Sequence, residues 1–247
     1  MERTRSSRLL MKLRAVAQEC EETLLGYERM PPHLLLDRLQ WKPDRPEEYC
    51  PGCGQSNDVL GMQCRCTTKS SPSSGVVRLG AYEEPLATWI KQVKFSRWEV
   101  MGAHLGRMLG IACRNRIMDE GTRIDAVVPT PMPRVRRYLR GIDHVQAVTD
   151  GVAQELGTPI TRVLVQKWGG TQARRSAEAR RRPRRVFHPW RWGKLVNGKN
   201  ILLVDDVLTS GQTAASLCRI LKTMGAQRIL LGVLAVSEMR PKTPLRA

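Results

Sequence analysis

The chain has 247 residues, of which 41% are hydrophobic, so it is long enough to bury a core around one main domain with appendages. Its 41 Lys and Arg against 23 Asp and Glu give a net charge of +18, which favours polyanionic partners such as phosphorylated sugars, nucleotides or nucleic acid. No apolar run reaches the roughly eighteen residues of a membrane span, and Lys12 and Arg14 interrupt the N-terminal apolar stretch, which makes it a poor secretory signal.

Residues 1–48 are predicted to be a helical N-terminal extension. Leu9, Leu10 and Leu13 recur at helical spacing, and a second leucine-rich stretch follows Pro31-Pro32. No function follows from this pattern.

Four cysteines predict a small zinc-ribbon-like module over residues 49–67. Cys50-Pro-Gly-Cys53 has the form of a knuckle that turns two thiolates toward one ion, and Cys64-Arg-Cys66 supplies a second pair. Four thiolates would close a tetrahedral, structural Zn²⁺ site with no position left for water. Only one residue separates Cys64 from Cys66, where zinc ribbons usually have two, and the alternatives are a redox Cys-x-x-Cys or unrelated buried thiols. The seven cysteines in all, an odd number, are more typical of a reducing cytoplasm than of a disulfide scaffold, so the chain is predicted to be cytoplasmic.

The Ser, Pro and Gly residues that come next predict a linker over 68–80, followed by a main domain over 81–238 and a tail over 239–247. Helical and strand patterns alternate in the main domain. Helices are predicted around 86–93, 100–117 and 143–156, and strands over 123–128, 159–165 and 228–236. This alternation predicts an α/β fold with a mainly parallel sheet flanked by helices.

Residues 166–192 are unlike the rest, because they are rich in arginine and poor in aliphatic side chains. Self-repulsion should keep this segment loose until a polyanion binds. It also contains Trp168, Phe187, Trp190 and Trp192, which are either stacking surfaces for single-stranded nucleic acid or side chains that pack on the edge of the domain.

The most informative stretch is 201–213, ILLVDDVLTSGQT. A buried strand runs into Asp205 and Asp206, and a loop of small and hydroxyl residues leads into a helix. Free backbone N–H groups at a helix start bind phosphate. The two carboxylates repel phosphate, so they are expected to accept hydrogen bonds from sugar hydroxyls beside it, and the pair of sites predicts a ribose 5-phosphate ligand. The alternative is an ordinary turn between a strand and a helix, with Asp206 as a cap.

Several motifs now stand in a characteristic order: the cysteine ribbon, a helix ending in Lys94-Phe95, a V-V-P-T-P strand end, an R-G element, a Q-x(7)-R loop and V-D-D-V-x-T-S-G-x-T. This order resembles that of the ComF-type (competence protein F) phosphoribosyltransferase-like proteins over roughly residues 50–236. The resemblance implies a type I phosphoribosyltransferase-like fold behind a four-cysteine zinc ribbon. It also implies phosphoribosyl pyrophosphate (PRPP) as a ligand, accompanied by Mg²⁺.

Positions matching the family motifs become candidate site residues. Asp205 and Asp206 would hold the ribose hydroxyls, Lys94 would neutralise the departing pyrophosphate, and Arg140 would lie near the acceptor. For Lys94 the alternative is a solvated helix end. The PRPP-binding candidates are Val204, Asp205, Asp206, Thr209, Ser210, Gly211, Gln212, Thr213, Pro129, Thr130 and Pro131, and the mobile-loop candidates are Gln172 and Arg180.

The family element R-G-F-N-Q stands here as Arg140-Gly141-Ile142-Asp143-His144. Two different side chains replace the amide pair, so recognition of the acceptor is expected to be altered. The alternative is that Asp143 or His144 caps a helix and has no chemical role, since Asp is common at that position.

The resemblance implies Mg²⁺-dependent transfer of ribose 5-phosphate from PRPP to a nitrogenous acceptor, whose identity no local motif reveals. The alternative is a protein of the DNA-uptake type that binds single-stranded nucleic acid, or senses PRPP, without catalysis. Steep salt dependence of oligonucleotide binding would favour the second. The oligomeric state leaves no signature in the sequence.

Overall fold

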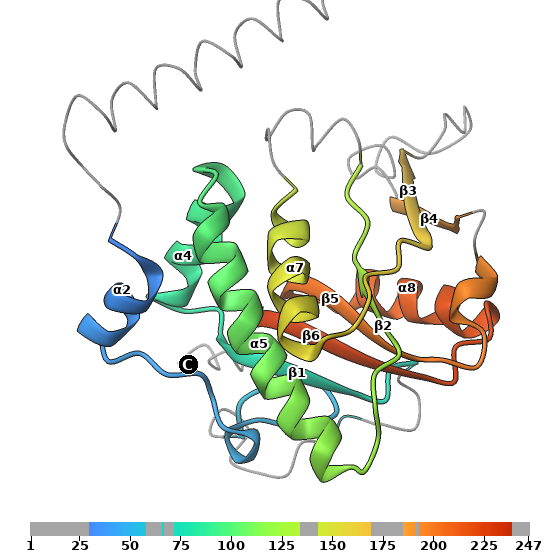
Figure 1. Cartoon of the computed structure of the whole chain (residues 1–247), viewed down its shortest axis with the longest axis horizontal. Helices are drawn as coiled ribbons and strands as arrows, with labels where there is room; N and C mark the ends of the chain where they lie inside the picture. The colour runs from blue at the N-terminus through green and yellow to red at the C-terminus, as the bar shows by residue number, and fades with distance from the viewer. Residues whose placement is uncertain are drawn as a thin grey trace, which may run out of the picture.

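A four-stranded parallel sheet lies at the centre of the computed structural model, which describes residues 30–57, 66, 72–133, 143–168, 185–190 and 193–238 (Figure 1). The strand order is β1-β6-β5-β2. A separate antiparallel pair, β3-β4, stands beside it. The strands are β1 (Gly75–Ala81), β2 (Ala126–Pro129), β3 (Leu164–Trp168), β4 (Arg185–Pro189), β5 (Asn200–Leu208) and β6 (Arg228–Val236).

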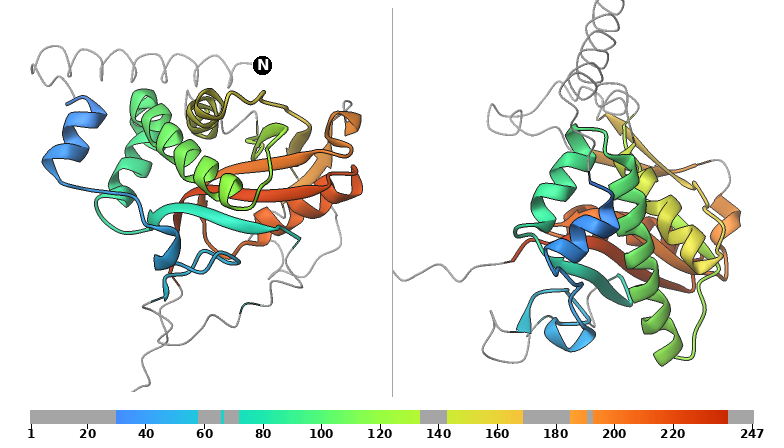
Figure 2. Two further views of the ribbon diagram at one scale, coloured as in Figure 1. Left: turned by 60° about the horizontal axis from the view of Figure 1, so that its bottom comes forward. Right: turned by 60° about the vertical axis from the view of Figure 1, so that its left-hand side comes forward.

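Helices cover both faces of the parallel sheet (Figure 2). Because successive strand residues point to opposite faces, Leu202 and Val204 of β5 join one hydrophobic cluster, whereas Ile201 and Leu203 join the other. A strand buried on both faces is expected to be an unbroken apolar run, as residues 201–204 of β5 are. The first cluster is covered by α4 (Leu86–Phe95), α5 (Glu99–Asp119) and α7 (His144–Leu156), and the second by α8 (Gln212–Thr223).

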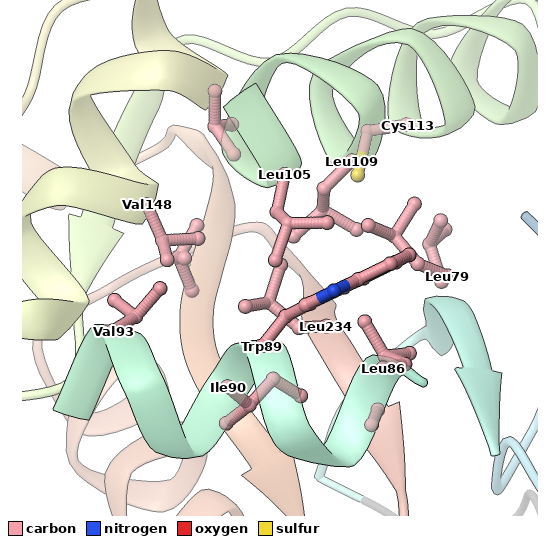
Figure 3. Packing of buried hydrophobic residues seen from close by; sticks show 14 of the residues in the cluster. Leu79, Leu86, Trp89, Ile90, Val93, Leu105, Leu109, Cys113, Val148 and Leu234 are labelled. Carbon is pink, nitrogen blue, oxygen red and sulfur yellow. The ribbon is translucent and has the colours of Figure 1, made fainter. Parts of the chain in front are cut away.

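Trp89 is a large side chain at the centre of the first cluster and is 3% exposed. Figure 3 shows it reaching from α4 toward Leu105 and Leu109 of α5. Its ring meets Trp41 edge-on, with the ring centroids 5.2 Å apart, and Leu36 of α2 (Pro32–Arg38) belongs to the same cluster. The described part of the N-terminal extension is therefore packed on the main domain, and it contains the helix predicted after the two prolines. A 3-10 turn, η1 (Pro46–Glu48), follows, and another, η4 (Gly193–Val196), precedes β5.

Two glycines let α5 and α7 cross at close range. A Cβ atom on Gly106 would lie 2.2 Å from the carbonyl oxygen of Val148, and one on Gly151 would lie 2.2 Å from that of Ala103. Any side chain at either position would push the helices apart. This contact sets the position of α7, whose first residue is His144.

Two expectations from the sequence need correction. Residues 75–80 are not part of a linker, because β1 begins at Gly75 and pairs with β6 inside the sheet. The strand expected over 159–165 begins only at Leu164, and its partner β4 is antiparallel. Apolar patterning marks a strand without naming its partner, so the sequence offered no means of separating this hairpin from the parallel sheet.

The other predicted elements lie close to their expected positions, with β2 starting at Ala126 and α5 at Glu99. Within the described ranges, no helix combines the length and apolar character that crossing a bilayer requires. Residues 1–29 of the extension and the tail over 239–247 lie outside the described part of the chain.

Candidate functional site

A cavity of about 270 Å³ opens at the carboxyl ends of β2 and β5. Open parallel sheets bind ligands at this end, where the loops that follow neighbouring strands diverge. The described residues that line it are Lys94, Thr130, Pro131, Met132, Pro133, His144, Val145, Gln166, Phe187, Asp205, Asp206, Val207, Leu208, Thr209, Ser210, Gly211, Thr213 and Ala214. The cavity thus brings together six separate segments of the sequence.

The loop between β5 and α8 forms one wall. Gly211 is the N-cap of α8 and has a φ of +70°, a left-handed conformation that favours glycine. Thr209 and Ser210 are exposed beside it. The first amides of a helix have no acceptor within the helix, and its positive dipole end attracts anions. The wall is therefore suited to an anion such as phosphate.

Asp206 is held by two donors on the same carboxylate oxygen. Its Oδ2 lies 3.0 Å from Nζ of Lys94 and 2.6 Å from Nε2 of His144, and its side chain is only 14% exposed. Burial by itself would raise the pKa of Asp206, but the hydrogen bond from His144 and the charge of Lys94 outweigh it and lower that pKa to about 2. The carboxylate is therefore a fixed anion at neutral pH.

No cation of the described residues forms a salt bridge with Asp205, and its pKa is raised rather than lowered. Burial, followed by the charge of the adjacent Asp206, raises the pKa of Asp205 to about 7. Its Oδ1 accepts a hydrogen bond from the backbone N–H of Asp206 at 3.0 Å. The strand continues through both residues to Leu208 rather than ending before them, so the two neighbouring carboxylates occupy different environments.

Several other sequence candidates are placed away from the cavity. In the described structure, Val204 is buried in the sheet, Pro129 ends β2 and Gln212 begins α8, and none of the three lines the cavity. Arg140, Gln172 and Arg180 lie outside the described residues.

Asp143 is a helix cap, as the alternative interpretation held. Its carboxylate accepts a hydrogen bond from the backbone N–H of Gln146 at 3.3 Å at the start of α7. His144, by contrast, faces the cavity and contacts Asp206. Only the packing of α7 beside β5 reveals this contact, because the two residues are 62 positions apart (206 − 144).

The β3-β4 hairpin contributes a wall that sequence analysis missed. Gln166 and Phe187 face each other in its register and both line the cavity. Phe187 also packs against the second hydrophobic cluster, whereas Trp190, just after β4, is 40% exposed. The side chains of Trp168 and Trp192 lie outside the described set.

The cysteines form a second candidate site. The sulfur atoms of Cys50, Cys53 and Cys66 all lie within 4.8 Å of one another, and those of Cys50 and Cys66 are 3.4 Å apart. Three converging thiols at this separation fit a tetrahedral zinc site. Cys64, the fourth predicted ligand, lies outside the described residues. Burial alone would raise the pKa of Cys50, but the amides of Cys53 and Gly52 and the neighbouring thiols lower it to about 7.

Arg78 of β1, which is 1% exposed, connects the cysteine knuckle to the sheet through hydrogen bonds. The Arg78 guanidinium donates to the carbonyl oxygen of Gly54 at 2.6 Å and to Oγ of Ser56 at 2.7 Å. It also forms salt bridges of 2.6 Å with Asp44 and with Glu238. One buried cation therefore joins the extension, the knuckle and the end of β6.

The chain is similar to known proteins in sequence and in structure. The sequence model of the phosphoribosyl transferase domain matches residues 147–246. Competence protein F of Haemophilus influenzae is 26% identical over 192 residues, which cover 76% of this chain and 84% of that protein. DNA utilization protein YhgH of Escherichia coli K12 is 28% identical over 182 residues, which cover 73% of this chain and 80% of that protein. Among solved structures, a purine phosphoribosyltransferase from Pyrococcus horikoshii is 17% identical to this chain and superposes with a TM-score of 0.37. The superposed region covers 53% of this chain and 73% of that enzyme.

The matched domain and the parallel sheet define a phosphoribosyltransferase-like protein of the type I fold, with a cysteine cluster in front of it. Within that class, the order of motifs and the relatives at 26% and 28% identity make the chain similar to the ComF-type proteins.

Proposed function

We propose that the cavity binds PRPP and that the protein transfers its ribose 5-phosphate to a nitrogenous acceptor. One observation carries the proposal: a helix start suited to phosphate, two carboxylates and a lysine face the same cavity. In this assignment, residues 209–213 wrap the 5-phosphate and Asp205 and Asp206 accept hydrogen bonds from the ribose hydroxyls. The ionisation of Asp206 supports this role, because an ionised carboxylate is a strong acceptor.

In the proposed reaction, the acceptor nitrogen forms a bond to C1 of the ribose. The bond from C1 to the pyrophosphate oxygen breaks, pyrophosphate leaves with the electron pair, and the acceptor proton passes to solvent. Positive charge develops on the ribose, where the fixed charge of Asp206 would stabilise it, and negative charge develops on pyrophosphate, which Lys94 would neutralise. Mg²⁺ bound together with PRPP would supply further neutralisation of the phosphate charge.

Calorimetric titration with PRPP and Mg²⁺ tests the assignment. We expect the wild type to bind and the Asp205→Asn/Asp206→Asn double variant to bind at least about a hundredfold more weakly, because it loses the charged acceptor Asp206 and the neighbouring carboxyl of Asp205. Asp37→Asn, at an exposed position on α2, is the matched control and should bind as the wild type does. Equal affinity of the wild type and the double variant would show that the site is wrongly assigned.

A second candidate function is favoured by the net charge of +18 and by relatives whose names refer to DNA utilization and competence. In this alternative the fold binds single-stranded nucleic acid without catalysis. Titration with an oligonucleotide at several salt concentrations separates the two. A steep fall of affinity with salt supports nucleic-acid binding, whereas a flat dependence removes it.

We assign Zn²⁺ to the cysteine cluster as a structural ion. The sulfurs of Cys50, Cys53 and Cys66 would hold it, with Cys64 as the fourth ligand predicted from the sequence. The cluster contributes no residue to the cavity lining in the described structure, in keeping with a structural role.

A further inference from the structure

The two donors on Asp206 come from different elements and differ in mobility. Lys94 ends a long, flexible side chain near the last turn of α4, and 17% of that side chain is exposed. His144 lies in the first turn of α7, and its side chain is 6% exposed. Both bond to the same oxygen, Oδ2, at 3.0 Å and 2.6 Å respectively.

Lys94 faces two competing demands. In the structure it neutralises Asp206, whereas in the proposed function it is the cation nearest to an incoming pyrophosphate. A buried carboxylate that loses its only partner is strongly destabilised, so a lysine alone on Asp206 would resist leaving it. A second donor on the same oxygen removes that obstacle, because the carboxylate keeps a hydrogen bond when the lysine departs.

His144 is suited to be this second donor because its position is fixed. Asp143 caps the helix that begins at His144, and the close crossing of α7 with α5 holds that helix in place. The charged and titratable groups of the described elements around the ring are Lys94 of α4, Asp205 and Asp206 of β5, and Asp143 in its own segment. Of these, only Lys94 competes with His144 as a donor to Asp206.

We propose that His144 is a positioning residue: it holds Asp206 in place while Lys94 moves from that carboxylate to the phosphates of the ligand. This inference rests on the proposed function, because it requires a ligand with a pyrophosphate group in the cavity. The inference predicts that His144 contributes to binding affinity only for a ligand that draws Lys94 away from Asp206. For a ligand that leaves Lys94 in place, replacing His144 should leave the affinity nearly unchanged.

PRPP and ribose 5-phosphate form the matched pair of ligands, since only PRPP carries the pyrophosphate. For His144→Leu we expect affinity for PRPP to fall by roughly tenfold or more, the effect of losing one hydrogen bond to a charged group, and affinity for ribose 5-phosphate to change by less than about threefold. His144→Gln, which retains an N–H donor, should restore most of the PRPP affinity. Both variants are measured by calorimetry beside the wild type.

The outcomes separate the two levels of inference. If the wild type binds PRPP and His144→Leu binds it as tightly, or binds both ligands equally weakly, the role of His144 is refuted while the proposed function stands. If the wild type binds neither ligand, both are refuted. A measurement on the wild type covers the case in which His144→Leu fails to fold: the imidazole N–H resonance of His144 should persist in the NMR spectrum when PRPP binds, and its loss would overturn the inference.

Discussion

Two clusters of buried charged side chains in this protein can be compared. One is centred on a cation, Arg78, and the other on a carboxylate, Asp206. At Arg78, one cation that is 1% exposed is surrounded by two carboxylates, a carbonyl oxygen and a hydroxyl. At Asp206, one carboxylate is held by a lysine and a histidine beside a second, neighbouring carboxylate. Only the second cluster faces the cavity at the carboxyl end of the sheet.

The difference shows that a buried charge is not by itself a sign of function. The Arg78 cluster pairs one buried cation with carboxylates from two other segments, so opposite charges meet in it. The Asp205–Asp206 pair places two carboxyl groups side by side, and burial, followed by the charge of Asp206, raises the pKa of Asp205. An electrostatic arrangement left unfavourable at the wall of a cavity is more typical of a binding site than of architecture.

The largest expected change in the free energy of unfolding follows from removing the Arg78 side chain. Arg78→Met should lower the free energy of unfolding by roughly 3–5 kcal/mol, because it leaves Glu238, whose side chain is 7% exposed, without a counter-charge. Urea denaturation followed by circular dichroism measures the change. Lys91→Met is the control, since the Lys91–Glu84 pair is separated by 3.7 Å and exposed, and should cost less than about 1 kcal/mol. Equal costs for the two variants would contradict an architectural role for Arg78.

Replacing Asp205 is expected to have a smaller effect of opposite sign, namely an increase in the free energy of unfolding. Its pKa is raised in the folded protein from 3.8 to about 7, so the folded state is favoured below pH 4 and loses that advantage as the pH rises through 7. Asp205→Asn stays uncharged, and it should therefore be more stable than the wild type by about 1–3 kcal/mol at pH 8 and no more stable at pH 4.

Asp206→Asn provides the matched comparison within the same cluster. The pKa of Asp206 is lowered to about 2, so its stabilising contribution is present above pH 4 and is lost as the pH falls through 2. The variant should be less stable than the wild type at pH 7, in part offset by relief of Asp205. Thermal unfolding at pH 4, 7 and 8 measures both variants, and an Asp205→Asn protein less stable than the wild type at pH 8 would reverse the assignment.

The smallest expected effect is a difference in thiol reactivity at the cysteine knuckle, which Arg78 contacts. In metal-free protein, Cys50 is 9% exposed and has a pKa of about 7, so at pH 7 it should react with a small thiol reagent faster than Cys113 and Cys218, which are 0% and 1% exposed. Burial raises the pKa of Cys113 and of Cys218 to about 12, so both should stay unmodified until the chain unfolds. Peptide mass spectrometry resolves the three sites. Zinc should protect Cys50, and an unprotected Cys50 in zinc-loaded protein would argue against the metal site.

Much of the fold was accessible from local patterns. The apolar run at 201–204 predicts a buried strand, and the apolar spacing from Ala214 onward predicts α8, which begins two residues earlier, at Gln212. The motif at 205–213 also predicted which loop would face a cavity. Local patterning did not reveal the antiparallel pairing of β3 with β4, nor that Arg78, in a stretch expected to be a linker, is among the most deeply buried side chains.

The sequence by itself determined the class of fold, the phosphate-type loop and the carboxylate pair, since each depends on residues within a few positions of one another. Tertiary structure alone decided that Lys94 and His144 converge on one oxygen of Asp206, and that Gln166 and Phe187 close the same cavity. The physical reason is that those contacts depend on how α4, α7 and the hairpin pack against the end of the sheet. Such packing is set by side chains spread over the whole chain, including the glycines that let α5 and α7 touch.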